Sequence, residues 1–368
     1  MIRRVIHIWE RKLSQRDINR MMIPFDWGLE FLSGCAATGD AHSGAKSSNG
    51  NESDARRIIF DFNERAIDDS ERFFAPPSAV KDFSFDGHWL SFPSQVRTPY
   101  ESNNTAYARY FPVPDGGANG SRASDSRASE AKRARGRAVI VLPQWNADVE
   151  SHVGLCRLLN RVGIAALRLS LPYHDRRTPE GLVRADYMVS ANMGRTLQAC
   201  QQAVTDLRGA IDWLIARGYD RVGITGTSIG SCIAFLAFVH DERLSVGAYN
   251  HVSSYFGDVV WEGISTAHVR RALETALTRE EVRRAWLAIS PNSYIELLTR
   301  NPRRGLFLSA RYDLSFPPEL SRLLFNECDR HGLNYDRTLV PWGHYTTGKT
   351  PFKYYVGYAI VNYLRKHL

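Results

Sequence analysis

The sequence has few cysteines and no long apolar run, and these two absences exclude several classes of protein. Five cysteines lie far apart among 368 residues, and no two form a Cys-x-x-Cys pair. A disulfide framework and a zinc site are therefore not expected. The longest apolar run is the segment 232–239, which is too short to span a bilayer. No apolar stretch follows the charged residues at the N-terminus, so we expect no signal peptide and a cytoplasmic location.

Positive charge is in excess, but it is confined to two segments. The net charge of +8 raises the question of a nucleic-acid or anionic-membrane partner. Residues 1–20 contain six basic and two acidic residues, and residues 114–137 contain six basic and three acidic residues. The rest of the chain is close to neutral. We therefore predict no nucleic-acid partner, and no motif indicates an oligomeric state.

The composition and the apolar pattern divide the chain into an extension and a larger domain. Apolar residues make up 43% of the chain, enough for a large core. Residues 1–80 are interpreted as an N-terminal extension that contains a flexible Gly/Ser/Asn-rich loop at 36–54. Residues 81–368 are interpreted as one α/β domain with a mobile loop at 114–137.

Short apolar runs alternate with helical patterns in the larger domain. Residues 82–92 and 104–113 alternate at period two, which predicts an antiparallel strand pair. Six further strands separated by helical segments predict a mostly parallel sheet flanked by helices; they are 138–142, 164–171, 221–225, 245–249, 305–310 and 337–342. About fifty residues, 251–300, separate two of these strands and are predicted to form a helical cap over one end of the sheet.

A candidate nucleophile lies where one of these strands meets a helix. The strand at 221–225 runs into Gly226-Thr-Ser228-Ile-Gly230, and an apolar helical segment follows. Glycines two positions on either side of a serine relieve crowding at a tight turn and leave its hydroxyl projecting. Ser228 could instead only cap the helix, but two suitable partner residues follow it in the sequence.

A serine hydroxyl needs a general base and an acid that orients the base. Asp313 follows the strand at 305–310, and His344 follows the strand at 337–342. Because carboxyl ends of parallel strands share one sheet edge, these side chains are expected near Ser228. The order Ser228, Asp313, His344 predicts a catalytic triad.

An oxyanion site is predicted beside the nucleophile. One donor is the backbone N–H of Ile229, which lies at a helix N-terminus. The second comes from the loop after the strand at 138–142, where the backbone N–H of Trp145 is favoured and that of Gln144 is the weaker candidate.

Other residues of the same types remain open as alternatives. Asp258 could be the acid, because it follows the preceding strand. His251 is predicted to line the pocket beneath the cap, and His331 to bind carbonyls at a helix C-terminus. His174 and Asp175 have no partner at zinc spacing, so no metal site is predicted.

Residues 138–368, with the strand pair before them, resemble the α/β-hydrolase fold in its serine esterase/lipase-like branch. The GTSIG, ARYDLSFP and WGHY segments and the cap-sized insertion carry the resemblance. It implies a carboxylesterase that needs no cofactor and cleaves a small-molecule ester through an acyl-enzyme. Pro143-Gln144 stands where many members have His-Gly. The alternatives are an amidase or peptidase with the same triad, and a non-catalytic binding protein on this scaffold.

Overall fold

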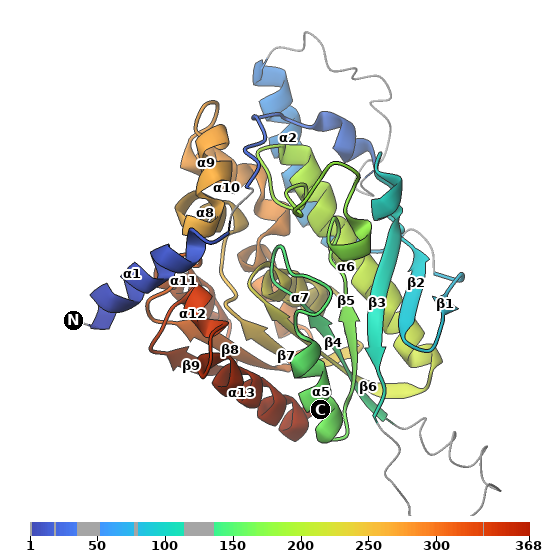
Figure 1. The fold of residues 1–368 in the computed structure, drawn as a ribbon. Coiled ribbons are helices and arrows are strands. Elements are labelled where there is room, and N and C mark those ends of the chain that lie inside the picture. Colours follow the sequence, from blue (N-terminus) through green and yellow to red (C-terminus); the bar gives the residue numbers. More distant parts are fainter. Residues whose placement is uncertain (1, 18–19, 35–51, 77–79, 114–135, 334) are drawn as a thin grey trace, which may run out of the picture.

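A computed structural model describes residues 2–17, 20–34, 52–76, 80–113, 136–333 and 335–368 (Figure 1). The two predicted loops, 36–54 and 114–137, lie almost entirely outside the described residues. Their last residues are regular structure, because helix α2 begins at Glu52 and strand β4 begins at Gly136. No helix among the described ranges is long and apolar enough to cross a bilayer.

The described strands form one sheet in the order β1-β2-β3-β5-β4-β6-β7-β8-β9. Strands β5 to β9 and β4 pair in parallel, and β1, β2 and β3 extend the sheet in antiparallel fashion. The predicted mixed sheet, mostly parallel, is confirmed. The strands are β1 Ser84–Phe85, β2 Trp89–Pro93, β3 Thr105–Phe111, β4 Gly136–Leu142, β5 Ala165–Leu169, β6 Tyr219–Thr227, β7 Leu244–Asn250, β8 Arg304–Ala310 and β9 Asp336–Val340.

The predicted strand 82–92 is wrong as a single element. The segment turns back on itself between β1 and β2, where the Asp86 carboxylate accepts the backbone N–H groups of His88 and Trp89. Gly87 follows with φ of 99°, a conformation that a glycine adopts without strain. The antiparallel part of the sheet therefore contains three strands, β1, β2 and β3, instead of the predicted two.

Helices cover both faces of the sheet because both faces of the parallel strands are apolar. On β4, Ile140 and Leu142 pack into the core with α6 and α7, whereas Val139 and Val141 pack on the opposite face with α5 and α13. The helices are α1 Ile2–Ser14, α2 Glu52–Asp68, α3 Ser70–Phe73, α5 Val153–Arg161, α6 Met193–Ala216, α7 Ile229–His240, α8 Phe256–Glu262, α9 Ala267–Leu273, α10 Arg279–Ala285, α11 Pro318–Arg330, α12 His344–Thr347 and α13 Phe352–His367.

The segment between β7 and β8 is helical, with α8, α9, α10 and three short 3-10 turns. Figure 1 shows α8, α9 and α10 grouped beside α2. Asn63 of α2 joins the two parts, because its side-chain amide donates to Ala285 O at 2.7 Å and accepts from Ala288 N at 2.9 Å. The insertion is thus bonded to the N-terminal region as well as to the sheet.

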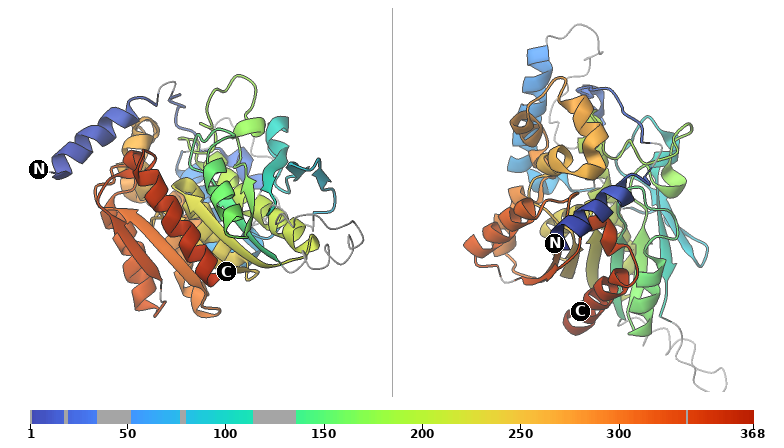
Figure 2. Two further views of the ribbon diagram at one scale, coloured as in Figure 1. Left: turned by 60° about the horizontal axis from the view of Figure 1, so that its bottom comes forward. Right: turned by 60° about the vertical axis from the view of Figure 1, so that its left-hand side comes forward.

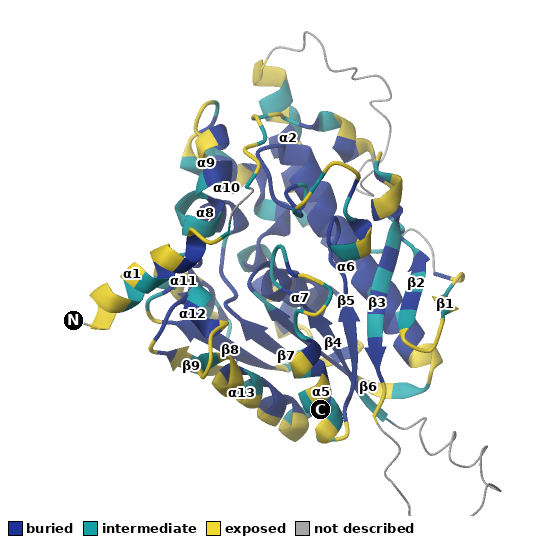
Figure 3. Ribbon diagram, in the orientation of Figure 1, coloured by how far each residue is buried: buried dark blue, intermediate teal, exposed yellow. Residues whose placement is uncertain are grey.

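The N-terminal helix α1 projects from the body of the molecule (Figure 2). Its outer half is exposed, with Ile2 at 65% and Ile8 at 59%, whereas Glu10, Leu13 and Ser14 near its end are buried (Figure 3). This helix therefore contacts the body mainly through its C-terminal half.

Candidate active site

Ser228 lies on a tight turn between β6 and α7. Its φ of 59° and ψ of −127° are unusual for a residue with a side chain. A Cβ at Gly226 would lie 2.1 Å from Gly230 O, and a Cβ at Gly230 would lie 2.3 Å from Pro143 O. Both glycines are therefore required by close backbone contacts, as the G-x-S-x-G pattern predicts.

The structure brings Ser228, His344 and Asp313 together at the carboxyl ends of three parallel strands. Ser228 Oγ lies 3.1 Å from His344 Nε2, and His344 Nδ1 lies 3.0 Å from Asp313 Oδ2. Asp313 follows β8, and His344 begins α12, after β9. The three side chains form a hydrogen-bonded chain in which the hydroxyl faces the imidazole and the carboxylate orients it.

The Asp313 carboxylate is buried, and both of its oxygens have hydrogen-bond partners. Its Oδ1 accepts the backbone N–H groups of Ser315 at 2.8 Å and Phe316 at 2.7 Å. Burial disfavours the charged form of this carboxyl, but His344 and His251 outweigh burial and hold its pKa well below the usual range. Asp313 is therefore ionised at neutral pH and can stabilise a positive charge on His344.

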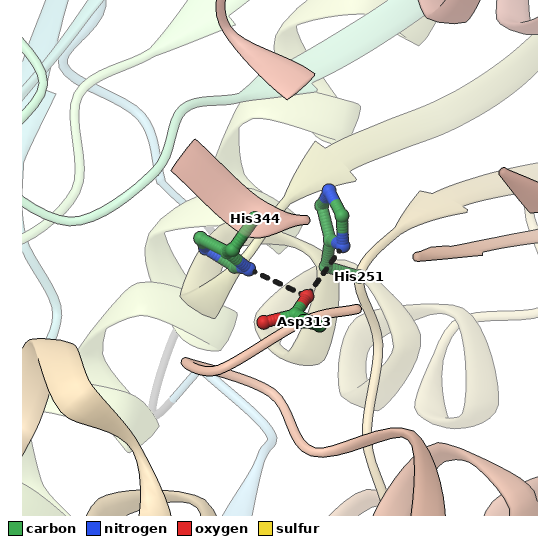
Figure 4. Close-up of side chains that lie close together, drawn as sticks. All are labelled: His251, Asp313 and His344. Atoms are coloured by element: carbon green, nitrogen blue, oxygen red, sulfur yellow. Dashed lines mark hydrogen bonds and ion pairs between the residues drawn. The ribbon is translucent and has the colours of Figure 1, made fainter. Parts of the chain in front are cut away.

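His251 is the main difference from the sequence-based site. It is not among the residues that line the cavity at Ser228; its Nδ1 lies 2.9 Å from Asp313 Oδ2, the same oxygen that His344 contacts (Figure 4). Its Nε2 lies 3.1 Å from the Thr347 hydroxyl. Burial and the nearby His344 lower the pKa of His251. The expectation that His251 lines the pocket is thus wrong, and two histidines share one carboxylate.

His344 is held by rings as well as by hydrogen bonds. The Phe316 ring stacks on it with centroids 5.1 Å apart. Burial lowers the pKa of His344, but the charge and hydrogen bond of Asp313, with a smaller contribution from Glu10, give a net increase. A base with a raised pKa accepts a proton from a serine hydroxyl more readily.

The predicted oxyanion loop follows β4 and lies beside the nucleophile. Trp145 and Ile229 both line the cavity at Ser228. Neither of their backbone N–H groups donates to another group in the described part of the chain. His174 fixes the loop: its Nε2 accepts the Asn146 N–H at 3.0 Å, and its Nδ1 bonds to Pro172 O at 2.8 Å. Burial lowers the pKa of His174 to about 4, so the imidazole stays a neutral acceptor.

The alternative residues lie elsewhere. Asp258 belongs to α8, where its carboxylate pairs with Arg279 at 3.1 Å and with Arg283. His331 follows α11, and its Nε2 lies 3.2 Å from Glu327. Neither contacts Ser228 or His344, so Asp313 and His344 are the residues whose geometry fits a triad.

A small cavity opens at Ser228 beneath the helical insertion. Its volume is about 40 Å³, room for about three water molecules. The lining is mostly apolar and comes from α7, α8 and the loops around them; it includes Trp145, Val189, Ile229, Phe256, Val259, Val260 and Phe316. A small apolar group bound there would lie against the serine hydroxyl.

His251, Asp313 and His344 also form the single cluster of potential metal ligands among the described residues, with ligand atoms within 4.8 Å of one another. His344 Nδ1 lies 3.0 Å from Asp313 Oδ2, and its Nε2 faces Ser228 Oγ at 3.1 Å, so both ring nitrogens already have a partner. We therefore interpret the cluster as a hydrogen-bonded relay.

Comparison with solved structures identifies the fold. No protein-family model and no curated protein sequence matches the chain. The acetyl xylan esterase from Paenibacillus sp. R4 is similar with a TM-score of 0.55 and 15% identity, over 88% of this chain and 97% of that one. The acylaminoacyl peptidase of Pyrococcus horikoshii is similar with a TM-score of 0.55 and 13% identity, over 78% of this chain.

The chain spans only 42% of the length of that peptidase. The protein is thus an α/β protein with a serine at a strand-to-helix turn, and it has the α/β-hydrolase fold, as the sequence motifs predicted.

Proposed function

We propose that the protein is a serine hydrolase that cleaves small carboxylic esters through an acyl-enzyme. The main support is the hydrogen-bonded chain from Ser228 through His344 to Asp313, with distances of 3.1 and 3.0 Å. The strained backbone of Ser228 adds to it, because such strain is typical of a nucleophile held on a tight turn.

In the first half of the reaction, Ser228 Oγ attacks the ester carbonyl carbon, and His344 Nε2 takes the hydroxyl proton. Asp313 keeps the proton on His344 Nδ1 and stabilises the imidazolium. The negative oxygen of the tetrahedral intermediate accepts the N–H groups of Ile229 and Trp145. The C–O bond to the alcohol then breaks, and the alcohol leaves with the proton from Nε2.

In the second half, water gives a proton to His344 Nε2 and attacks the acyl carbon. The intermediate collapses to the carboxylic acid, and Ser228 Oγ recovers its proton. Every proton is moved by the same imidazole, so no cofactor is needed.

The cavity favours a short acyl group. Since a cavity of about 150 Å³ holds benzene, about 40 Å³ has room for about two carbon atoms, the size of an acetyl group. The similar Paenibacillus protein is named for acetyl esters, which agrees with this size.

Amide or peptide hydrolysis is the alternative within the same chemistry. The similar Pyrococcus protein is named a peptidase, but this chain spans less than half of its length.

A non-catalytic binding protein is the third hypothesis. If such a protein binds nucleic acid through the basic segments, its retention on DNA or RNA falls as the salt concentration rises.

The test is hydrolysis of p-nitrophenyl acetate and butyrate by the full chain, beside acyl-amide substrates of the same acyl length. Ser228→Ala is expected to lower kcat by about 10³-fold or more. Ser245→Ala, at an exposed position on β7, is the matched control and is expected to keep wild-type turnover. A fluorophosphonate probe should label Ser228 alone. Wild-type turnover by Ser228→Ala, or an active enzyme that the probe does not label, refutes the proposal.

A further inference from the structure

Glu10 is a buried carboxylate that the reaction described above does not use. It lies on α1, far from the catalytic residues in sequence, and has 0% exposure. Its Oε2 accepts the backbone N–H of Tyr345 at 3.0 Å, and its Oε1 accepts that of Thr346 at 2.7 Å. These are the two residues that follow His344. The carboxylate is therefore bonded to the turn that carries the catalytic base.

The turn is shaped to receive this carboxylate. A Cβ at Gly343 would lie 2.4 Å from the Glu10 carboxyl carbon, so any larger residue would push the carboxylate away. The Thr346 hydroxyl accepts the Gly343 N–H at 2.8 Å and fixes the start of the same turn. Glycine at position 343 thus leaves the space that the Glu10 carboxylate occupies.

Arg20 connects the C-terminal end of α1 to the helical insertion and to the turn that bears His344. Arg20 donates to Ser14 O at 2.9 Å and to the Tyr345 hydroxyl at 3.3 Å, and it lies 3.4 Å from Ile264 O in the insertion. Leu13, near the C-terminal end of α1, is buried. The N-terminal segment therefore bridges the insertion and the turn that bears His344, while its outer half stays exposed (Figures 2 and 3).

We propose that Glu10 is a positioning residue for the catalytic base: helix α1 brings its carboxylate to the turn of His344, fixes that turn and favours the imidazolium that forms during the reaction. The inference rests on the proposed function, because it gives Glu10 a part in the same proton transfers.

The charges around His344 are few and can be named. Asp313 and Glu10 are the carboxylates that interact with it. The neighbouring imidazole is that of His251, whose ring centroid lies 4.5 Å from that of His344. Tyr345 donates its backbone N–H to Glu10, and Arg20 donates to the Tyr345 hydroxyl. Burial raises the pKa of Glu10, although the two N–H groups oppose that rise. Both carboxylate oxygens accept N–H groups, so these contacts fit the ionised form.

The experiment compares Glu10→Gln, Glu10→Asp and the wild type. Glutamine keeps the size but removes the charge and one acceptor, whereas aspartate keeps the charge on a shorter side chain. Glu71→Gln is the matched control, because Glu71 is exposed and lies near the C-terminal end of α7, away from Ser228 at its other end. The pH dependence of kcat/KM and the thermal unfolding midpoint are measured for each.

His344 acts as a base when neutral, so activity rises with pH through its pKa. Loss of the Glu10 charge makes the imidazolium less stable and moves this acidic limb to lower pH. We expect a shift of roughly half a unit or more in Glu10→Gln and a smaller one in Glu10→Asp. kcat is expected to fall about tenfold in Glu10→Gln with little change in KM, because Glu10 does not line the cavity.

If the acidic limb of the kcat/KM–pH profile has the same midpoint in Glu10→Gln and in the wild type, the proposal is overturned, even if the thermal unfolding midpoint of the variant falls. If Glu10→Gln does not fold, Glu10→Asp decides, because unchanged kcat and an unchanged limb in that variant would also overturn it. An NMR titration of the His344 imidazole, assigned with His344→Gln, measures the same coupling without substrate. A wild type that hydrolyses no ester and resists the fluorophosphonate probe would refute the proposed function, while the titration would still test Glu10.

Discussion

Substitution of Gly230 by alanine tests whether the oxyanion loop depends on the nucleophile turn. The new Cβ would lie 2.3 Å from Pro143 O and 2.7 Å from Leu142 O, both backbone atoms at the end of β4. Side-chain carbons do not approach other atoms closer than 3.0 Å, so Gly230 and Pro143 must separate by about 0.7 Å. Trp145, the proposed oxyanion donor, follows two residues later.

The expected effect is on catalysis more than on binding. A displacement near 1 Å costs about 10²-fold in rate, and loss of one oxyanion donor costs about 10²- to 10³-fold. We therefore expect kcat of Gly230→Ala to fall about 10²-fold, with KM changed less than about threefold. Overpacking should also lower the free energy of unfolding by about 1–3 kcal/mol.

The assay is steady-state hydrolysis of p-nitrophenyl butyrate, well below the unfolding temperature of each variant. Gly154→Ala is the control, since a Cβ at Gly154 in α5 meets no atom within 4 Å. It should keep wild-type kcat and gain up to about 1 kcal/mol of stability. A kcat for Gly230→Ala within about threefold of the wild type would show that this contact does not position the loop.

Three further predictions follow from the site. His251→Phe removes a polar partner from Asp313 and from Thr347, and it should lower the free energy of unfolding in urea by about 1–3 kcal/mol; wild-type stability would contradict the shared carboxylate. The pKa of His344 is raised above its ordinary 6.5, so kcat/KM should rise with pH through a midpoint above that value; a limb centred below pH 6 would contradict it. Because the cavity is about 40 Å³, acetate and butyrate esters should exceed octanoate in kcat/KM by about tenfold, and the opposite order would refute the size argument.

The parallel strands could be predicted because their signal is local. A strand buried on both faces is a continuous apolar run, and β4 is buried at Ala138–Leu142 for this reason. The sequence pattern does not indicate the turn between β1 and β2, because apolar and polar residues alternate across it. Asp86-Gly87 is the local signal that could have indicated it, because Asp accepts N–H groups of a turn and glycine takes the positive φ.

The residues that support the triad could not be predicted from local pattern. Glu10 and Tyr345 are separated by 335 positions, and nothing in the surroundings of Glu10 distinguishes it from a solvated residue of an amphipathic helix. His251 and His174 are both histidines near strand ends, and only the packing decides that one bonds to Asp313 and the other to the oxyanion loop. The three residues of the proposed triad, in contrast, could be placed at one edge of the sheet from the sequence, because each of them directly follows a predicted parallel strand.

The bond between Asn63 and the helical insertion limits how the chain can be shortened. A fragment that began at residue 81 would lose Asn63 and leave Ala285 O and Ala288 N of the insertion without their buried partner. It would also lose Phe62, Phe73 and Phe74, which are buried in the same core as the sheet. Expression, crystallisation or engineering of this protein should therefore keep the N-terminal region, even though the residues proposed for bond cleavage all lie beyond it.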